Sequence, residues 1–287
     1  MPIGLIVFFI GLAVWLVISV RAVRRKEYGA FFAWGLGLLL FLNLRYFIEG
    51  ASSGIAFFIG IYDVLDNVGL VAGEVPGGMA TCPDNACTVW GETYQTHTTW
   101  AVAFHERFLN GPQFRRNLLY SHIGFNTLAF LLMHVQLIRT GVGRHRAFHR
   151  IVGRVGFAAV TLSVFSACWL ASQHGAVPEY GSVLSTYGFY FMSACVYVPV
   201  VLSVVTIRRG DLGGHRKWVI RYAGAMWGSF WLFRVMLFVL DPLFRDYNTV
   251  AIQLCIWLSA PLGIVIAEAF RRRAEAPSAT VSEPVLA

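Results

Sequence analysis

Charged residues are scarce in this chain. Asp, Glu, Lys and Arg make up 13% of its 287 residues, whereas hydrophobic residues make up 57%. A soluble globular domain usually carries about a quarter charged residues, so the composition excludes a soluble globule. We therefore expect the lipid bilayer to be the main solvent of the folded chain.

Common catalytic motifs are also missing. The sequence contains no HExxH zinc motif, no Walker A motif and no GxGxxG dinucleotide fingerprint. The loops predicted on the inner face of the membrane are too short to hold a catalytic domain. At most, we expect electron transfer within the membrane.

Seven apolar runs each approach the roughly 20 residues that a helix needs to cross a bilayer. They lie at 2–20, 29–48, 118–138, 155–174, 184–207, 222–241 and 249–269. These runs predict an all-α, polytopic integral membrane protein with about seven transmembrane helices. The expected regions are a two-helix membrane region (1–49), an extracytoplasmic loop with interfacial helices (50–116), a four-helix core of spans three to six (117–241), a last transmembrane helix (242–273) and a disordered cytoplasmic tail (274–287).

Most of the 23 basic residues fall in four clusters at the ends of these runs. The clusters are Arg21, Arg24, Arg25 and Lys26; Arg139, Arg144, Arg146, Arg150 and Arg154; Arg208, Arg209, Arg216, Lys217 and Arg221; and Arg271, Arg272 and Arg273. Because cytoplasmic loops are enriched in Lys and Arg, we expect the N-terminus outside and the C-terminus in the cytoplasm. Anionic lipid headgroups, and no nucleic acid, are the expected partners of this charge.

The segment between the second and third spans contains two cysteines in one loop. Cys82 and Cys87 enclose a turn-forming sequence on the outer side of the membrane, where disulfides persist, so we predict a local disulfide between them. The apolar stretch 54–73 contains Asp63 and Asp66, which favours an interfacial or re-entrant helix over an eighth span.

Two similar segments of the inner face begin with a His-Arg pair. They contain His149, Arg150 and Arg154 before the fourth span, and His215, Arg216 and Arg221 before the sixth. Their spacing predicts two helical hairpins in parallel orientation, as a loose internal repeat. Plain topology explains their charge. A shaped site for a phosphate, a carboxylate or a quinone oxygen explains the choice of arginine equally well.

These segments resemble the predicted multi-pass bacterial membrane proteins grouped as domain of unknown function family 2306. The matching residues are His122, Gln136, His149, Arg150, Gly153, Arg154, His215, Arg216 and Arg221. The resemblance covers 118–241, and Val219 stands where the second signature often has Met. It implies a location in a bacterial inner (plasma) membrane but implies no established activity.

The third span has a polar face. At 100° per residue, His122 and Gln136 fall near one line, whereas His134 points about 120° away. The two histidines lie about 18 Å apart along the helix axis. Because an unpaired imidazole is unfavourable in lipid, the polar face is expected to turn toward the bundle.

Histidines at two membrane depths suggest haem b, with the propionates paired to arginines of the inner face. His174 is the expected second ligand beside His122, and His145 or His149 the expected second ligand beside His134. The angular offset between His122 and His134 weakens this hypothesis.

Three functional hypotheses follow from the sequence. The first is a redox protein that binds haem b or a quinone in the helical core. The second is a small-molecule or ion transporter, suggested by the repeat and by Arg234 within the sixth span. The third is a non-enzymatic accessory or scaffold subunit of a membrane protein complex, consistent with an aromatic content of 15%.

Overall fold

The computed structural model describes residues 3–25, 27–50, single positions between 53 and 68, 86–89, 92–95, 112–138, 146–172, 183–244 and 248–275. Its described part contains seven helical runs long and apolar enough to cross a membrane, which confirms the predicted all-helical membrane fold. They are α1 (Ile3–Arg25), α2 (Gly29–Ile48), α5 (Gln113–Ile138), α6 (Arg146–Ser172), α7 (Val183–Arg208), the run of α8 (Leu212–Trp227), η3 (Gly228–Leu232) and α9 (Phe233–Leu243), and α10 (Asn248–Glu275).

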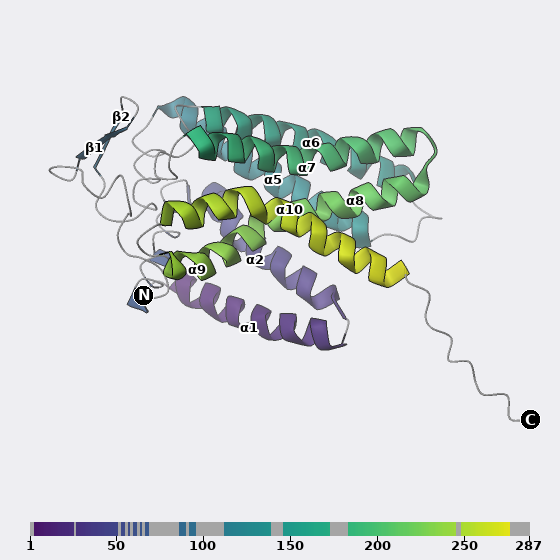
Figure 1. Cartoon of the computed structure of the whole chain (residues 1–287), viewed down its shortest axis with the longest axis horizontal. Helices are drawn as coiled ribbons and strands as arrows, with labels where there is room; N and C mark the ends of the chain where they lie inside the picture. The colour runs from purple at the N-terminus through teal and green to yellow at the C-terminus, as the bar shows by residue number, and fades with distance from the viewer. Residues whose placement is uncertain are drawn as a thin grey trace, which may run out of the picture.

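The seven runs alternate in direction, so the ends that carry the basic residues lie together (Figure 1). We call this the basic end of the bundle: it contains the last turns of α1, α7 and α10 and the first turns of α6 and α8. At the opposite end, β1 (Ala86–Val89) and β2 (Glu92–Gln95) form an antiparallel hairpin that the sequence did not predict.

The two helices that contain the His-Arg pairs begin well before the predicted spans. The fourth and sixth spans were expected from 155 and 222, whereas α6 begins at Arg146 and α8 at Leu212. The apolar run underestimates the helix because a helix can continue through polar residues beyond the hydrocarbon. Both His-Arg pairs therefore lie inside the first turns of helices and not in loops before them.

The turn between α7 and α8 is built from local hydrogen bonds. Gly210 has a φ of +79°, which glycine adopts without the steric penalty of a side chain. The Asp211 amide donates to the Thr206 carbonyl (3.0 Å) and the Gly210 amide to the Ile207 carbonyl (3.1 Å), as in a Schellman motif. The Asp211 carboxylate then caps α8 by accepting from the Gly214 amide at 2.7 Å.

The helices pair as two antiparallel hairpins, α5 with α6 and α7 with α8, and α6 also packs against α7. The predicted core of spans three to six is thus present, and α10 joins it by packing on α7 and α8. Small residues permit this approach, since a Cβ on Gly263 would lie 2.2 Å from the Gly224 carbonyl oxygen. A Cβ on Gly228 would lie 2.4 Å from the Ser259 carbonyl oxygen.

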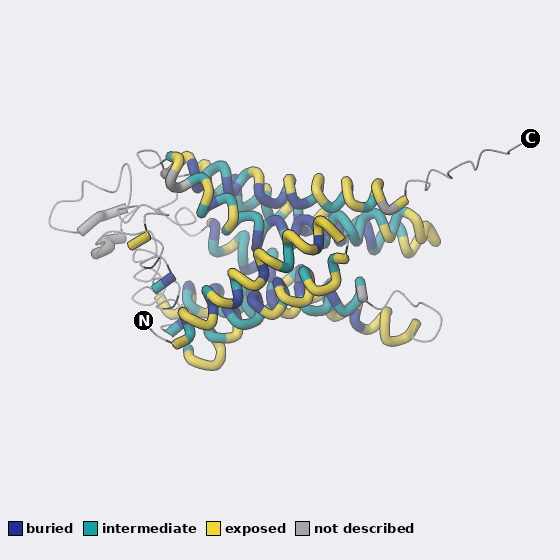
Figure 2. The backbone as a smooth tube through the Cα atoms, turned by 90° about the horizontal axis from the view of Figure 1, so that it is seen from below, coloured by how far each residue is buried: buried dark blue, intermediate teal, exposed yellow. Residues whose placement is uncertain are grey.

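Buried residues gather along the centre of the bundle, and exposed residues lie on its outer faces (Figure 2). The outer faces are largely apolar, as expected for surfaces in contact with lipid. An aromatic cluster around Trp227 joins α1, α2 and α5 to α8, with ring centroids 5.1 to 6.4 Å from that of Trp227. Its other members are Trp15, Phe31, Phe32, Phe130 and His134.

The segment after α2 is helical at its described positions between 53 and 67. Phe57 and Ile61 are buried in the hydrophobic core. The Arg45 guanidinium lies 4.2 Å from the Phe57 ring centroid and pairs with Glu49 at 2.6 Å. This segment is therefore held against α1 and α2 by apolar and cation-π contacts.

Candidate functional site

A cavity of about 440 Å³ opens near the basic end, between α7, α8 and α10. Its lining combines apolar side chains, which we call the apolar wall, with the charged group of Arg221, Glu268 and Arg272, which we call the charged wall. The lining residues are Pro199 of α7, Trp218 and Arg221 of α8, and Ile264, Val265, Glu268, Ala269 and Arg272 of α10. Such a combination suits a ligand with one apolar and one charged part.

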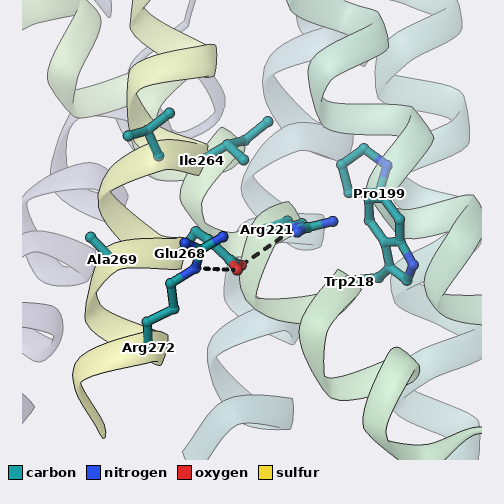
Figure 3. A pocket seen from close by; sticks show the side chains of 8 residues that line it. Pro199, Trp218, Arg221, Ile264, Glu268, Ala269 and Arg272 are labelled. Atoms are coloured by element: carbon teal, nitrogen blue, oxygen red, sulfur yellow. Dashed lines mark hydrogen bonds and ion pairs between the residues drawn. The ribbon is translucent and has the colours of Figure 1, made fainter. Parts of the chain in front are cut away.

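Glu268 lies at the centre of the charged wall. Figure 3 shows Arg221 and Arg272 approaching its carboxylate from opposite sides. Arg221 donates from Nε to Oε2 at 3.3 Å, and Arg272 donates from Nε to Oε1 at 3.2 Å. Arg271 binds both oxygens as a fork, from Nη2 to Oε1 at 2.7 Å and from Nε to Oε2 at 3.2 Å. This carboxylate therefore ties α8 to α10.

Two arginines of the cavity keep most of their hydrogen-bonding capacity. A guanidinium has five N–H donors. Within the described part of the chain, Arg221 and Arg272 each donate only from Nε, and Arg221 also stacks on Trp218 with Cζ 4.5 Å from the ring centroid. The Nη groups of both arginines are therefore available to a ligand in the cavity.

The two His-Arg segments meet at the basic end. His149 is the fourth residue of α6 and His215 the fourth residue of α8, and the two are close enough to interact electrostatically. Gln136 donates to the His149 carbonyl at 2.7 Å. The His215 ring donates from Nδ1 to the Ser203 carbonyl at 2.9 Å. Each histidine thus has a hydrogen bond that links its helix to the preceding one.

The other predicted arginines lie on the surface. Arg150, Arg154 and Arg216 are exposed, and among the described residues Arg150 donates only to the Arg146 carbonyl within its own helix, at 3.4 Å. Of the predicted arginines, only Arg221 lines the cavity.

The histidines of α5 lie apart from this cavity. The His134 ring is buried, with Nδ1 donating to the Phe130 carbonyl (2.8 Å) and Nε2 accepting from the Trp227 indole (3.1 Å). Both nitrogens are engaged, so this ring has no lone pair available for a haem iron. His122 is half-buried nearer the start of α5, and its Nδ1 faces the Ser163 carbonyl at 3.1 Å. The Ser163 hydroxyl lies 3.4 Å from the same nitrogen, but the nearer carbonyl only accepts, so the contact favours a proton on Nδ1 and a lone pair on Nε2.

Several predicted residues lie outside the described part of the chain. These are His145, His174 and Cys82, together with the side chain of Cys87, whose backbone belongs to β1. The predicted disulfide and the predicted haem ligands His145 and His174 therefore stay predictions, whereas His149 is described and no longer has His134 as a partner ligand, because both nitrogens of His134 are engaged.

Sequence reasoning missed Glu268 as a site residue and assigned Arg272 to topology alone. A signal was present, because Glu268 is the acidic residue at the end of the last apolar run, three and four positions before Arg271 and Arg272. Its partner on α8 could not be found in this way.

Comparison with known proteins gives a match to the part of the chain that forms the cavity. The family model described as "Predicted membrane protein (DUF2306)" matches residues 119–270. The matched segment covers more than half of the 287 residues and every lining residue of the cavity except Arg272. No match was found among curated proteins or among solved structures.

Proposed function

This chain belongs to the predicted membrane protein family DUF2306, and we propose that it binds an anionic amphiphile of the bilayer in the cavity between α7, α8 and α10. Membership confirms the resemblance seen in the His-Arg signatures. The acidic headgroup would accept from Arg221 and Arg272, and the apolar part would lie along Pro199 and Ile264.

The observation that carries this proposal is the pair of arginines with uncommitted donors beside an apolar wall. The cavity lies near the basic end, where the polar headgroups of a bilayer would meet the helix ends. Trp218 has the amphipathic ring that is enriched at this depth. Topology alone requires basic residues here but does not require a cavity that joins them to apolar side chains.

Removing the two arginines tests the proposal. We expect the double variant Arg221→Gln and Arg272→Gln to bind phosphatidylglycerol at least tenfold more weakly, because each charge-assisted hydrogen bond contributes about 1.5–3 kcal/mol. Lipid adducts of the detergent-purified full chain, counted by native mass spectrometry during a titration, give the affinity. The control is Arg273→Gln, since Arg273 is adjacent in sequence, exposed and outside the cavity lining.

The same titration separates a lipid from a free anion. We expect glycerol phosphate to compete poorly with the lipid, because it cannot occupy the apolar wall. An equal loss of lipid in the double variant and in the Arg273 control would contradict the proposal, since it would show a general effect of surface charge.

Redox chemistry is the second candidate, and His122 is the observation that favours it. The Ser163 carbonyl orients the His122 ring with its lone pair on Nε2, as second-shell partners orient the histidine ligands of metals. If haem b binds there, the purified protein should show a Soret band that shifts on reduction with dithionite, and His122→Ala should abolish it. A purified protein without that band would remove the haem hypothesis.

Transport and an accessory role in a membrane complex remain hypotheses from the sequence. The Arg234 side chain, which suggested transport, donates from Nη1 to the Phe230 carbonyl at 2.7 Å and lies 3.8 Å from the centroid of the Phe230 ring. Both contacts lie within its own helical run and stabilise the cation without a substrate.

A further inference from the structure

The charged wall of the cavity contains one carboxylate beside its two guanidinium groups. Arg221, Arg272 and Glu268 are the charged lining residues, and two positive charges with one negative charge leave a single positive charge. We propose that Glu268 restricts this site to headgroups with one negative charge, such as a phosphodiester. This inference rests on the proposed function, because it concerns the ligand of the same cavity.

Glu268 is fixed in place. Within the described residues its carboxylate accepts four hydrogen bonds, from arginines on both α8 and α10, and its side chain is only 13% exposed. Arg271, which supplies the fork, is itself held from the other side by Glu275. A ligand therefore meets the Glu268 charge in the wall of the cavity, because the side chain cannot turn away without breaking the fork.

The position of Glu268 between the arginines makes its charge selective. An anion that accepts from both Arg221 and Arg272 must lie close to the carboxylate that those arginines already share. One negative charge on the ligand balances the wall. A second would face Glu268, whose further cation Arg271 is already shared between Glu268 and Glu275 among the described residues, and such repulsion is stronger near a protein than in bulk water.

A second role for Glu268 is compatible with the same contacts. The carboxylate also joins α8 to α10, so its removal changes stability as well as charge. Stability alters the affinity for all lipids alike, whereas charge selection alters the ratio between lipids of different charge. The ratio is therefore the informative measurement.

The test compares two lipids with identical acyl chains, phosphatidylglycerol with one negative charge and phosphatidic acid with two at pH 8. We expect the full-length wild type to favour phosphatidylglycerol, and Glu268→Gln to shift the affinity ratio about tenfold toward phosphatidic acid. The control Glu275→Gln removes a carboxylate that binds Arg271 but is 63% exposed and outside the lining, so its ratio should stay within twofold of wild type. An unchanged ratio in Glu268→Gln would overturn the inference.

A second test measures lipid binding by the wild-type protein at different pH values and needs no variant. A phosphomonoester loses its second proton near pH 6, so the affinity for phosphatidic acid should fall between pH 5.5 and pH 8. Phosphatidylglycerol keeps its charge over this range and reports any effect of histidine titration. A parallel change for both lipids would overturn the inference. Glu268→Asp, which keeps the charge, should retain the wild-type ratio.

The two proposals fail differently. If neither lipid depends on Arg221 and Arg272, the proposed function is wrong. If both lipids depend on these arginines but Glu268→Gln leaves the ratio of their affinities unchanged, the proposed function stands and the charge selection is wrong.

Discussion

Gly263→Ala is expected to lower the free energy of unfolding by about 3 kcal/mol, the upper range for overpacking a core. The added methyl would lie 2.2 Å from the Gly224 carbonyl oxygen and 2.8 Å from the Gly228 Cα. Both are backbone atoms of the facing helix, so no side chain can rotate away. Relief requires α8 and α10 to separate. SDS-induced unfolding of the detergent-solubilised protein measures this loss.

Gly37→Ala is the matched control. Gly37 is also helical, but a Cβ there would meet nothing within 4 Å. Since alanine is the better helix former, we expect this variant to be unchanged or slightly more stable. If both glycines tolerate alanine equally, α8 and α10 do not cross as closely as described.

Trp227→Ala is expected to destabilise the bundle by about 3 kcal/mol, the lower end of the range for large aromatic deletions in cores, because Trp227 is partly buried. The indole contacts five rings from α1, α2 and α5 and packs on Gly35, where a Cβ would lie 2.6 Å from it. The substitution also leaves Nε2 of His134 without its donor. Thermal unfolding followed by circular dichroism measures the effect.

Two further variants divide this effect into its parts. Trp227→Phe keeps an aromatic ring but removes the hydrogen bond to His134, so it should lose about 1–3 kcal/mol. Trp169→Ala removes an indole that is 41% exposed on the outer face, and should lose less than Trp227→Ala because lipid replaces its contacts. An equal loss at Trp169 and Trp227 would contradict a structural role for the aromatic cluster.

The candidate site was predictable only in part. Arg221 and His215 were found because a His-Arg pair recurs at a fixed spacing, and both lie at the basic end as expected. His134 was found as a polar residue in an apolar run. Its partner, however, is Trp227, 93 residues away, and the hydrogen bond between them lies within the helix bundle. A histidine in a span indicates that a partner is needed and does not say which partner.

The sequence alone determines the number of spans and the end at which the basic residues gather. Both depend on local quantities, the apolar length needed to cross a bilayer and the placing of Lys and Arg beside it. The tertiary structure decided that Glu268 meets Arg221 across 47 residues, and that a cavity forms beside them. These contacts depend on how closely the run of α8 and η3 approaches α10 at Gly224, Gly228 and Gly263, and helix packing of this kind has no signature in local periodicity.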